Sequence, residues 1–418
     1  MTTGDGRGDL APTRRFPYWR WENRKTLRMH RAVQEALERA KLHVTFAAYA
    51  RSDEMKAAVL YEPGQPLVIE DVQLDPPKAG EVHVKIGAAG ICRSDLHVMK
   101  GEATHLLPVV LGHEGSGTVL DVGAGVTRVK PGDRVILSFV PYCGHCHFCL
   151  TNRANLCDQH MSTPGVLFDK TTRLHKGSQR IHHYGKVACF AQEAVVPETG
   201  CIPVAPDFPL PQAALIGCCV TTGVGAAIYN AKITPGSTVA VVGCGGVGLN
   251  VIQGARLQNA SKIIAVDLNE GKLEFAMRFG ATHTVNPTLQ DPVAAIRELT
   301  GGLGADYTFE VFGSSQTVQT AYLAARKGGT VVVVGLAPVG DNASIDPVML
   351  VRQEKTLKGS YYGSARPAID MPTMVQLYRA GKIDVDGLIT RTYRLDQINQ
   401  AYKDIDGSDA GRGVITQF

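Results

Sequence analysis

The sequence contains no unbroken apolar run of about 18 residues, which is the length that a bilayer-spanning helix usually needs. Its N-terminus lacks the apolar stretch that forms the core of a secretory signal peptide. No internal repeat and no low-complexity tract is evident. The lack of a membrane-spanning run argues against a membrane partner, and the lack of a signal peptide core argues against secretion. We therefore expect a cytoplasmic protein.

Surplus charge is also scarce outside the N-terminal segment. The formal net charge is +4, and residues 1–54 account for all of it with eleven Lys or Arg and seven Asp or Glu. The rest of the chain carries 32 charges of each sign. Nucleic-acid binders rely on a basic surplus that neutralises phosphates, so we expect no nucleic-acid partner.

Length and composition fit a protein of two domains. A chain of 418 residues is too long for one ordinary domain, and its 44% hydrophobic and 20% charged residues are typical of a soluble globular protein.

Within the N-terminal segment, Asn23–Leu42 has apolar residues near helical spacing and predicts a short amphipathic helix. A transit peptide is an alternative, but Glu22, Glu35 and Glu38 are acids that such peptides usually lack.

Four of the ten cysteines lie close together between residues 143 and 157. In a reducing compartment such a cluster favours metal binding over disulfides, and four thiolates can close a tetrahedron around a structural zinc. The predicted ligands are Cys143, Cys146, Cys149 and Cys157. An iron–sulfur site fits this spacing less well, because the last cysteine is followed by Asp158 rather than by proline.

A second set of metal-ligating side chains lies in the glycine-rich stretch from Gly90 to Gly117. Catalytic zinc usually has three protein ligands drawn from Cys, His and carboxylates, with a fourth position open for water or substrate. Cys92 and His113 supply two such ligands, and Cys218, much further along the chain, is a candidate third. The sequence therefore predicts a catalytic zinc site that is closed by a distant loop.

A dinucleotide-binding fingerprint follows in the second half of the chain. An apolar strand over 237–242 leads into Gly243-Cys-Gly-Gly-Val-Gly, which opens a helix, and the next strand ends in Asp267. The glycines let the backbone approach a pyrophosphate at the helix N-terminus. Because the Asp267 carboxylate can accept from a ribose 2′-hydroxyl and would repel a 2′-phosphate, we predict NAD rather than NADP.

Helix and strand patterns alternate from there to about residue 334, which predicts about six parallel strands with right-handed crossovers in a doubly wound α/β fold. Between residues 55 and 140, short β-rich runs separated by Pro and Gly turns predict a small, mainly β unit. After Tyr361 the chain is expected to return to this unit through a helix near 371–380.

With these motifs in view, the chain resembles the zinc-dependent medium-chain alcohol dehydrogenases from Met55 to the C-terminus. The resemblance implies a Rossmann domain at 221–361, and a GroES-like catalytic domain with a zinc lobe at 55–220 and 362–418. Met55 is similar to the natural start of the family, so residues 1–54 are interpreted as an upstream extension or a mis-assigned start. The resemblance also implies about two zinc ions per chain, NAD as cofactor and a homodimer.

The resemblance gives each polar residue near the catalytic zinc a role. The metal stabilises the alkoxide from which hydride leaves for the nicotinamide. Ser94 would take the alcohol proton and pass it through the nicotinamide ribose to His97, whose ordinary pKa near ~6.5 suits release at neutral pH; a surface histidine is the alternative for His97. Asp95 would orient His113, and Glu114 would be a transient ligand or a charge behind the metal, unless each acid forms a simple buried salt bridge.

The third zinc ligand implied by the resemblance is Cys218, because the family motif Ile-Gly-Cys ends at this residue and not at its neighbour Cys219. The cysteines without a metal role are expected to be small buried residues. They are Cys189, Cys201, Cys219 and Cys244.

The resemblance also places residues around the cofactor and the substrate. Arg93 and Arg412 match positions that contact the pyrophosphate, which suits arginine's paired donors, and Lys272 matches a position near the adenosine ribose. The other predicted cofactor-binding residues are Thr222, Gly243, Gly245, Gly246, Val247, Gly248, Asp267 and Val334. The predicted substrate pocket suits an apolar or aromatic alcohol and is lined by Phe139, Tyr184 and Leu336.

The predicted function is reversible hydride transfer between a primary or secondary alcohol and NAD. One alternative is a formaldehyde dehydrogenase that acts on a thiol adduct. Glutathione is disfavoured as that thiol, because Met161 stands where such relatives carry arginine and His97 where they usually carry tyrosine. A second alternative is an alcohol dehydrogenase that holds NAD permanently. The third is a catalytically idle zinc protein, against which the intact ligand set argues.

Overall fold

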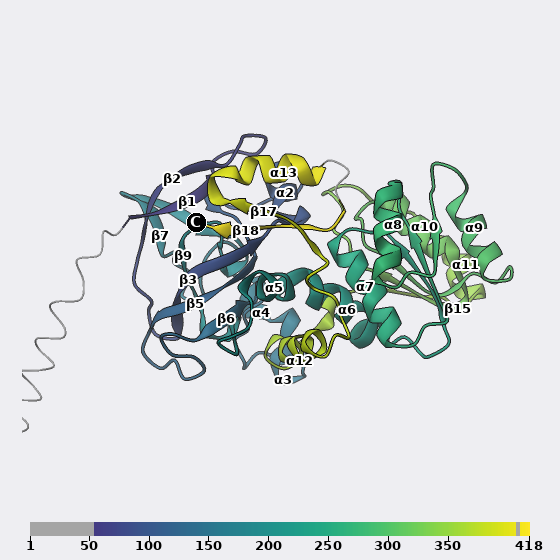
Figure 1. Ribbon diagram of the computed structural model, residues 1–418, viewed down its shortest axis with the longest axis horizontal. Helices are drawn as coiled ribbons and strands as arrows, with labels where there is room; N and C mark the ends of the chain where they lie inside the picture. The colour runs from purple at the N-terminus through teal and green to yellow at the C-terminus, as the bar shows by residue number, and fades with distance from the viewer. Residues whose placement is uncertain (1–53, 407–409) are drawn as a thin grey trace, which may run out of the picture. The chain divides into compact units, whose positions relative to one another are not determined.

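The computed structural model describes residues 54–406 and 410–418, which belong to one compact unit (Figure 1). The helix predicted at 23–42 lies outside these residues. Figure 1 shows a mainly β part, which contains the early strands and the last one, and an α/β part built from the middle of the chain. Because both parts belong to the same compact unit, the domain boundaries at 220/221 and 361/362 stay predictions.

The β part consists of a closed barrel and a mixed sheet. The barrel has the strand order β1-β2-β7-β8-β4, and the sheet has the order β10-β6-β5-β3-β18-β17, with β9 paired to β3. The barrel strands are β1 (Glu54–Leu60), β2 (Val68–Leu74), β4 (Val109–Val110), β7 (Leu174–Lys176) and β8 (Gln179–His183). The sheet strands are β3 (Glu81–Gly90), β5 (Glu114–Val122), β6 (Arg134–Leu137), β9 (Glu193–Pro197), β10 (Cys201–Val204), β17 (Ile389–Arg394) and β18 (Arg412–Gln417).

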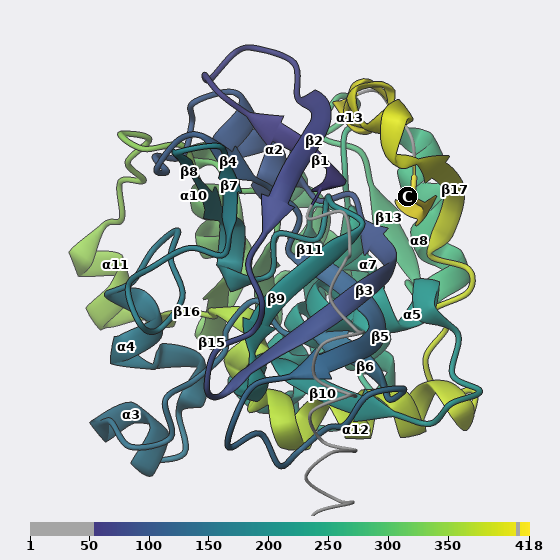
Figure 2. The same ribbon diagram turned by 90° about the vertical axis from the view of Figure 1, so that its left-hand side faces the viewer.

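β3 is the central strand of the mixed sheet, and Figure 2 shows it between β9 and β5. It is buried along most of its length, and its backbone pairs with strands on both edges. The last strand of the chain, β18, pairs antiparallel with the end of β3, where Val414 faces Gly90. The end of β3 and the starts of β5 and β18 therefore meet in one place.

The α/β part is built on a six-stranded sheet in the order β13-β12-β11-β14-β15-β16, and every neighbouring pair is parallel. Its central strands are buried on both faces, as expected for a parallel sheet covered by helices. The strand order reverses between β11 and β14, so a ligand is expected beyond their carboxyl ends. The strands are β11 (Thr238–Val242), β12 (Lys262–Val266), β13 (His283–Val285), β14 (Ala305–Glu310), β15 (Ala325–Val333) and β16 (Thr356–Gly359).

Except for the helix that follows Gly245, the helices that connect these strands begin at polar side chains that accept from free backbone N–H groups. Asn269 caps α8, Asp291 caps α9 and Ser314 caps α10. α8 ends at Gly280, whose φ of 113° is in the left-handed region that glycine favours. The helices are α7 (Gly246–Leu257), α8 (Glu270–Phe279), α9 (Pro292–Leu299), α10 (Ser315–Ala324) and α11 (Pro347–Arg352).

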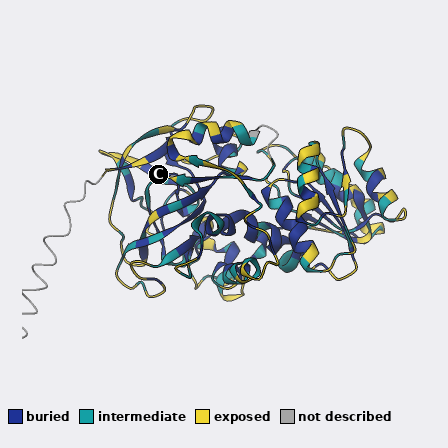
Figure 3. Cartoon of the chain, in the orientation of Figure 1, coloured by how far each residue is buried: buried dark blue, intermediate teal, exposed yellow. Residues whose placement is uncertain are grey.

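An apolar helical run over Leu210–Ala231 joins the two parts. Its segments are α5 (Leu210–Leu215), η4 (Ile216–Val220), α6 (Thr221–Gly225) and η5 (Ala226–Ala231). Its length and mean hydropathy of 1.4 would suit a membrane span, but 83% of the apolar window is buried inside the molecule, so it is a core helix. The run is not an unbroken apolar stretch, because Thr221 and Thr222 interrupt it. Figure 3 shows buried residues concentrated here and in the strands of both parts.

The chain returns to the β part after β16, as the sequence predicts. α12 (Pro367–Arg379) corresponds to the helix predicted near 371–380, and β17 and β18 then complete the mixed sheet. Further helices in the described residues are α2 (Arg93–Met99), α3 (His147–Leu150), α4 (Asp158–Met161), α13 (Ile398–Asp406), η1 (Ala154–Leu156), η2 (Tyr184–Lys186), η3 (Glu198–Gly200), η6 (Tyr362–Ser364) and η7 (Leu395–Gln397).

Candidate active site and metal centres

A cavity of about 1140 Å³ is lined by residues of both the β part and the α/β part. On one side it is lined by Cys92, His113 and Cys218. On the other side it is lined by Gly243 in the glycine-rich turn and by Asp267 after β12. Groups that the sequence assigns to a metal and to a nucleotide therefore face the same space.

The structure brings together a buried cluster of metal-ligating atoms that all lie within 4.8 Å of one another. The residues are Cys92, His113, Glu114 and Cys218. Cys92 follows β3, His113 and Glu114 stand at the start of β5, and Cys218 is in η4. The prediction that a distant loop supplies Cys218 is wrong. Cys218 belongs to a continuous helical run. This run can approach β6 closely because Gly217 has no side chain, and a Cβ there would lie only 2.7 Å from the backbone oxygen of Leu137.

Asp95, a fully buried residue of α2, holds His113. One carboxylate oxygen accepts from the backbone N–H of Gly112 at 2.9 Å, and the other lies 3.0 Å from Nδ1 of His113. Gly112 has a φ of 89°, and a Cβ there would lie 2.7 Å from the Phe190 ring, so this turn requires glycine. Because Nδ1 faces Asp95, Nε2 is left for the metal cluster. Burial opposes the imidazolium, but Asp95 and Cys92 outweigh it and raise the pKa of His113.

The thiols of Cys92 and Cys218 affect each other's ionisation. The hydrogen bond from Cys218 lowers the pKa of Cys92, helped by Arg412 and His113, and the same contact raises the pKa of Cys218. A divalent cation would hold both groups as thiolates. Two sulfurs, one imidazole nitrogen and a carboxylate in a buried site form a donor set that fits zinc.

Glu114 pairs with Arg412 and also belongs to the metal cluster. Its Oε1 accepts from the Arg412 guanidinium, which donates a second bond to the backbone oxygen of Ile91 at 2.9 Å. Its Oε2 is buried and has no hydrogen-bond partner among the described residues, as expected of an oxygen that can approach a cation. Burial raises the pKa of Glu114 to about 8, although Arg412 opposes the rise. Glu114 can therefore form the buried salt bridge with Arg412 and also act as the charge behind the metal.

The two predicted relay residues lie on α2 and line the cavity. The Ser94 hydroxyl oxygen is 3.8 Å from the Cys92 sulfur. One helical turn further on, His97 has a side chain that is 15% exposed, and its Nδ1 lies 2.5 Å from Oε2 of Glu102. Glu102 was not identified from the sequence.

The glycine-rich turn between β11 and α7 has the geometry that the fingerprint requires. Gly243 has a φ of 103°, and a Cβ on Gly248 would lie 1.9 Å from the backbone oxygen of Gly243. Asp267 follows β12 and accepts from the backbone N–H of Cys244 at 2.9 Å and from that of Asn269 at 3.1 Å. These bonds hold the Asp267 carboxylate at the cavity wall.

All the predicted cofactor-binding residues except Gly248 line the cavity. They are Arg93, Thr222, Gly243, Gly245, Gly246, Val247, Asp267, Lys272, Val334 and Arg412. The guanidinium of Arg93 lies over the Phe312 ring at 5.1 Å. Nε of Arg412 is buried without a hydrogen-bond partner among the described residues, and a Cβ on Gly246 would lie 2.4 Å from it. Arg412 therefore connects the metal cluster to the nucleotide turn, and its contact with the pyrophosphate stays a prediction.

Two of the predicted pocket residues place aromatic rings beside His113 in the cavity. The rings of Phe139 and Tyr184 stand edge-on to the His113 ring, with centroid distances of 5.1 and 5.5 Å. Leu336, the third predicted pocket residue, also lines the cavity and is 60% exposed. An apolar or aromatic side of an alcohol could pack against these rings.

Two further aromatic residues of the cavity wall, Tyr361 and Tyr362, were not identified from the sequence. The Tyr362 ring lies 4.2 Å from the Phe139 ring, and its hydroxyl donates to the backbone oxygen of Gly217 at 2.5 Å. The signal that could have revealed them is their position just beyond β16, since side chains at the carboxyl ends of parallel strands face the ligand.

The structure also brings the four lobe cysteines together, with ligand atoms within 4.8 Å of one another. The sulfur of Cys149 lies 3.5 Å from that of Cys146 and 3.9 Å from that of Cys143. The Cys143 backbone N–H donates to the sulfur of Cys157 at 3.2 Å. A backbone N–H at Cys149 lowers the pKa of Cys146 to about 6, whereas burial raises the pKa of Cys149 to about 12. Four sulfurs with no open position fit a structural zinc.

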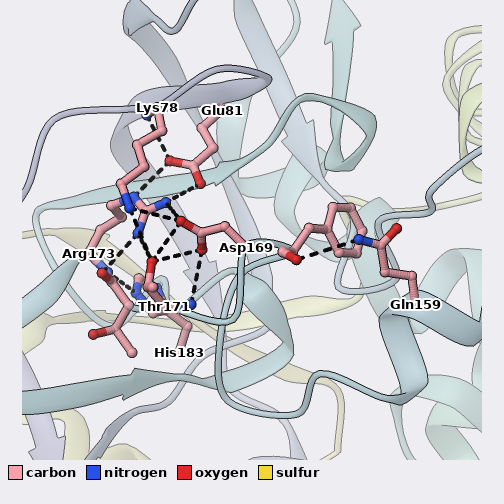
Figure 4. A network of polar contacts seen from close by, with 9 residues as sticks. Lys78, Glu81, Gln159, Asp169, Thr171, Arg173 and His183 are labelled. Atoms are coloured by element: carbon pink, nitrogen blue, oxygen red, sulfur yellow. Dashed lines mark hydrogen bonds and ion pairs between the residues drawn. The ribbon is translucent and has the colours of Figure 1, made fainter.

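A buried arginine ties the segment after the lobe to the β part (Figure 4). Arg173, 1% exposed, donates to both carboxylate oxygens of Glu81, at 2.8 and 2.5 Å, and to Asp169 at 2.7 Å. Its backbone N–H donates to Nε2 of His183 at 2.9 Å. Because His183 directly precedes Tyr184, this network helps to fix a residue that lines the cavity.

Comparison with known proteins places the chain in a family. Residues 78–207 match the alcohol dehydrogenase GroES-like domain, and residues 246–380 match the zinc-binding dehydrogenase family. The chain is 40% identical over 364 residues to the NDMA-dependent alcohol dehydrogenase of Amycolatopsis methanolica, covering 86% of this chain and 98% of that protein. The chain belongs to the zinc-dependent alcohol dehydrogenase family. The crystal structure of benzyl alcohol dehydrogenase from Acinetobacter calcoaceticus is similar, with a TM-score of 0.83, 35% identity, and coverage of 87% of this chain and 99% of that one.

Family membership confirms the predicted enzyme class and the fold, a GroES-like domain with a Rossmann-type parallel sheet. The chain is an oxidoreductase with alcohol dehydrogenase activity, and it uses zinc and a nicotinamide cofactor. This finding argues against a catalytically idle zinc protein.

Proposed function

We propose that this alcohol dehydrogenase is specific for NAD, binds both a catalytic and a structural zinc, and oxidises primary or secondary alcohols of apolar or aromatic character. The observation that carries the proposal is the cavity itself, where Cys92, His113 and Cys218 face the glycine-rich turn and Asp267. The aromatic rings around His113 support an apolar substrate. The cytoplasmic location expected from the sequence is part of the same proposal.

The chain's own side chains divide the work of oxidation. Held by Cys92, His113 and Cys218, zinc would supply Lewis-acid stabilisation of the alcohol oxygen, and the nicotinamide would accept the hydride. The Ser94 hydroxyl, in the first turn of α2, accepts the alcohol proton as its own proton moves on toward His97, and the His97 imidazole releases a proton to solvent. The aromatic residues keep water from the reacting carbon, which strengthens the electrostatic interactions in the site.

The choice of NAD rests on Asp267. Its carboxylate lines the cavity at the end of β12, where the adenosine ribose of a dinucleotide is expected. A carboxylate accepts from a 2′-hydroxyl and repels a 2′-phosphate, so NADP should bind much more weakly.

The test is a steady-state assay of NADH formation with benzyl alcohol and ethanol, each with NAD and with NADP, on protein of measured zinc content. We expect a higher kcat/KM for benzyl alcohol than for ethanol and a clear preference for NAD. Zinc-loaded protein that oxidises no alcohol in the panel, or that prefers NADP, would contradict the proposal.

A second candidate is an alcohol dehydrogenase that retains its nicotinamide and returns the hydride to a second substrate. The observation that favours it is the relative of 40% identity whose name states a dependence on NDMA. Nucleotide released by denaturing the purified, dialysed protein separates the two candidates. A stoichiometric amount of NAD(H) supports the retained form, and its absence supports exchange at each turnover. Activity with a formaldehyde–thiol mixture in place of an alcohol would favour the thiol-adduct alternative instead.

We also propose that the enzyme is a homodimer joined at the edge of its parallel sheet. β16 is an edge strand, and exposed apolar side chains lie on it and on α11, with exposures of 38% for Leu357, 56% for Val348 and 73% for Val351. An uncovered edge with apolar neighbours is a surface that a twofold partner can cover. Light scattering during size-exclusion chromatography should give twice the chain mass, and a monomer mass would refute this part.

A further inference from the structure

Glu102, which no motif singles out, makes a close contact with a residue of the active site. It lies just beyond the end of α2, and its Oε2 is 2.5 Å from Nδ1 of His97. The His97 side chain is 15% exposed and that of Glu102 is 36% exposed. His97 lines the cavity, whereas Glu102 does not. Any effect of Glu102 on substrate chemistry therefore acts through His97.

The contact decides which nitrogen of His97 can take up a proton. An ionised carboxylate can only accept hydrogen bonds, so the imidazole nitrogen beside it must carry the hydrogen. Neutral His97 is then the Nδ1–H tautomer, and its lone pair is on Nε2. A proton that arrives at Nε2 produces an imidazolium ion beside the Glu102 carboxylate, which stabilises the new charge.

The backbone holds Glu102 in place for this contact. Its N–H donates to the backbone oxygen of His97 at 2.8 Å, and its carbonyl accepts from the N–H of Val339 at 3.2 Å. Val339 follows β15 and belongs to the α/β part, so Glu102 is fixed from both parts of the molecule. A side-chain substitution leaves both backbone bonds available.

We propose that Glu102 is a positioning residue for alcohol oxidation, which holds His97 in the Nδ1–H tautomer so that Nε2 accepts the proton released by the substrate. This inference rests on the proposed function, because it assigns Glu102 a part in the proton transfer from Ser94 to His97. It predicts that Glu102 has no effect on the rate once His97 is gone.

A double-mutant cycle tests this dependence. We compare the parent enzyme, Glu102→Gln, His97→Gln and the double variant by the kcat of benzyl alcohol oxidation and by the burst of NADH formation. Glu102→Gln alone should lower the rate roughly three- to thirtyfold. This loss lies between the free-energy contribution of an exposed ion pair and that of a buried hydrogen bond to a charged group. In the His97→Gln background it should change the rate by less than about twofold, because coupled residues are not additive.

Two variants separate positioning from simple structural damage. Glu102→Asp keeps a carboxylate and should recover part of the lost rate. Glu193→Gln is the matched control, because it removes a carboxylate that lies 2.6 Å from His83 between β3 and β9, away from the cavity. It should leave kcat at the parent value. NAD binding and zinc content should be the same in all variants.

Parent-like kcat in Glu102→Gln, or an equal loss in the two backgrounds, would overturn the proposal. Nitrogen NMR of the histidine rings gives an independent answer in the resting enzyme. His97, assigned by its absence in His97→Gln, should be the Nδ1–H tautomer in the parent and should lose this preference in Glu102→Gln. Identical tautomer signals in both proteins would refute the inference. If the parent oxidises no alcohol, the proposed function fails, and the NMR result still decides whether Glu102 fixes the tautomer.

Discussion

Asp267 uses its carboxylate both for the fold and for the predicted choice of cofactor. It accepts from two backbone N–H groups, those of Cys244 and Asn269, and it still lines the cavity. Because these bonds fix its orientation, little conformational entropy should be lost when a ribose hydroxyl donates to it. The residue therefore offers a preorganised acceptor at the end of β12.

Replacing Asp267 should change cofactor affinity in a specific direction. Asp267→Gly removes a charged acceptor and should weaken NAD binding by about 1.5–3 kcal/mol, roughly ten- to a hundredfold, while NADP binds relatively better. Asp267→Asn is the matched control, because it keeps an acceptor oxygen for the turn and should lose less NAD affinity. Titration of NAD and NADP by fluorescence measures both. Equal NAD affinity in Asp267→Gly and the parent would refute the assignment.

Sequence reasoning found side chains that have a chemical signature and missed those that act through contacts. The cysteines and His113 could be selected because zinc restricts the types of its ligands. Glu102 follows His97 by five residues, which is outside the spacing at which side chains meet on a helix, and only the turn after α2 brings the two together. Tyr361 and Tyr362 depend on where β16 ends, which local patterns do not specify.

At the level of elements, boundaries are set by caps that the apolar pattern does not show. The pattern predicts a helix from Leu273, whereas α8 begins at Glu270 because Asn269 caps it. The sequence also predicts a helix over 221–230, and in the structure these residues form the later part of a helical run that begins at Leu210. Glycine and cysteine residues conceal the first turns of this run in the sequence. The first five strands of the parallel sheet could be predicted, since their apolar runs are short and bounded by turns. β16 was missed, because its four residues, Thr-Leu-Lys-Gly, include one apolar side chain.

The zinc lobe is an element whose role should be structural. Cys146→Ser should remove about one zinc ion per chain and lower the melting temperature, because a structural zinc contributes folding free energy. Its folded fraction should keep turnover with benzyl alcohol, since the catalytic cluster has its own ligands. Metal analysis and thermal unfolding measure these effects. A variant with parent-like melting but no turnover would reverse the assignment of roles.

The segment after the lobe should make stability depend on pH through His183. Burial, helped by Arg173, lowers the pKa of His183 to about 3. The unfolded chain takes up a proton below about pH 6.5 and the folded chain only near pH 3, so stability should fall by about 1.4 kcal/mol per pH unit within this window. His183→Gln cannot take up that proton.

The measurement compares melting temperatures of the parent and His183→Gln at pH 7 and pH 5. The variant loses the acceptor for the Arg173 backbone N–H, so it should be less stable at pH 7, and the difference should narrow at pH 5. A difference for His183→Gln that stays constant or widens would contradict the sign of the shift.

On the scale of the whole molecule, the candidate active site forms where distant segments of the chain meet. Cys92 follows β3, His113 precedes β5, Cys218 lies in the helical run that joins the two parts, and Arg412 begins the last strand. The family resemblance allowed this assembly to be predicted. Local sequence patterns alone do not tell which of the two adjacent cysteines faces the cavity. In the structure Cys218 lines the cavity and Cys219 does not.

The most direct test of the account compares Cys218→Ser with Cys219→Ser. Both change a buried cysteine of the same helical segment, so their effects on packing should be similar. We measure zinc per chain together with NADH formation from benzyl alcohol. Cys218→Ser should lose about one zinc ion and at least about a hundredfold in turnover, because it opens the catalytic metal site, whereas Cys219→Ser should keep both. Full zinc content and turnover in Cys218→Ser, or an equal loss in the two variants, would contradict the account.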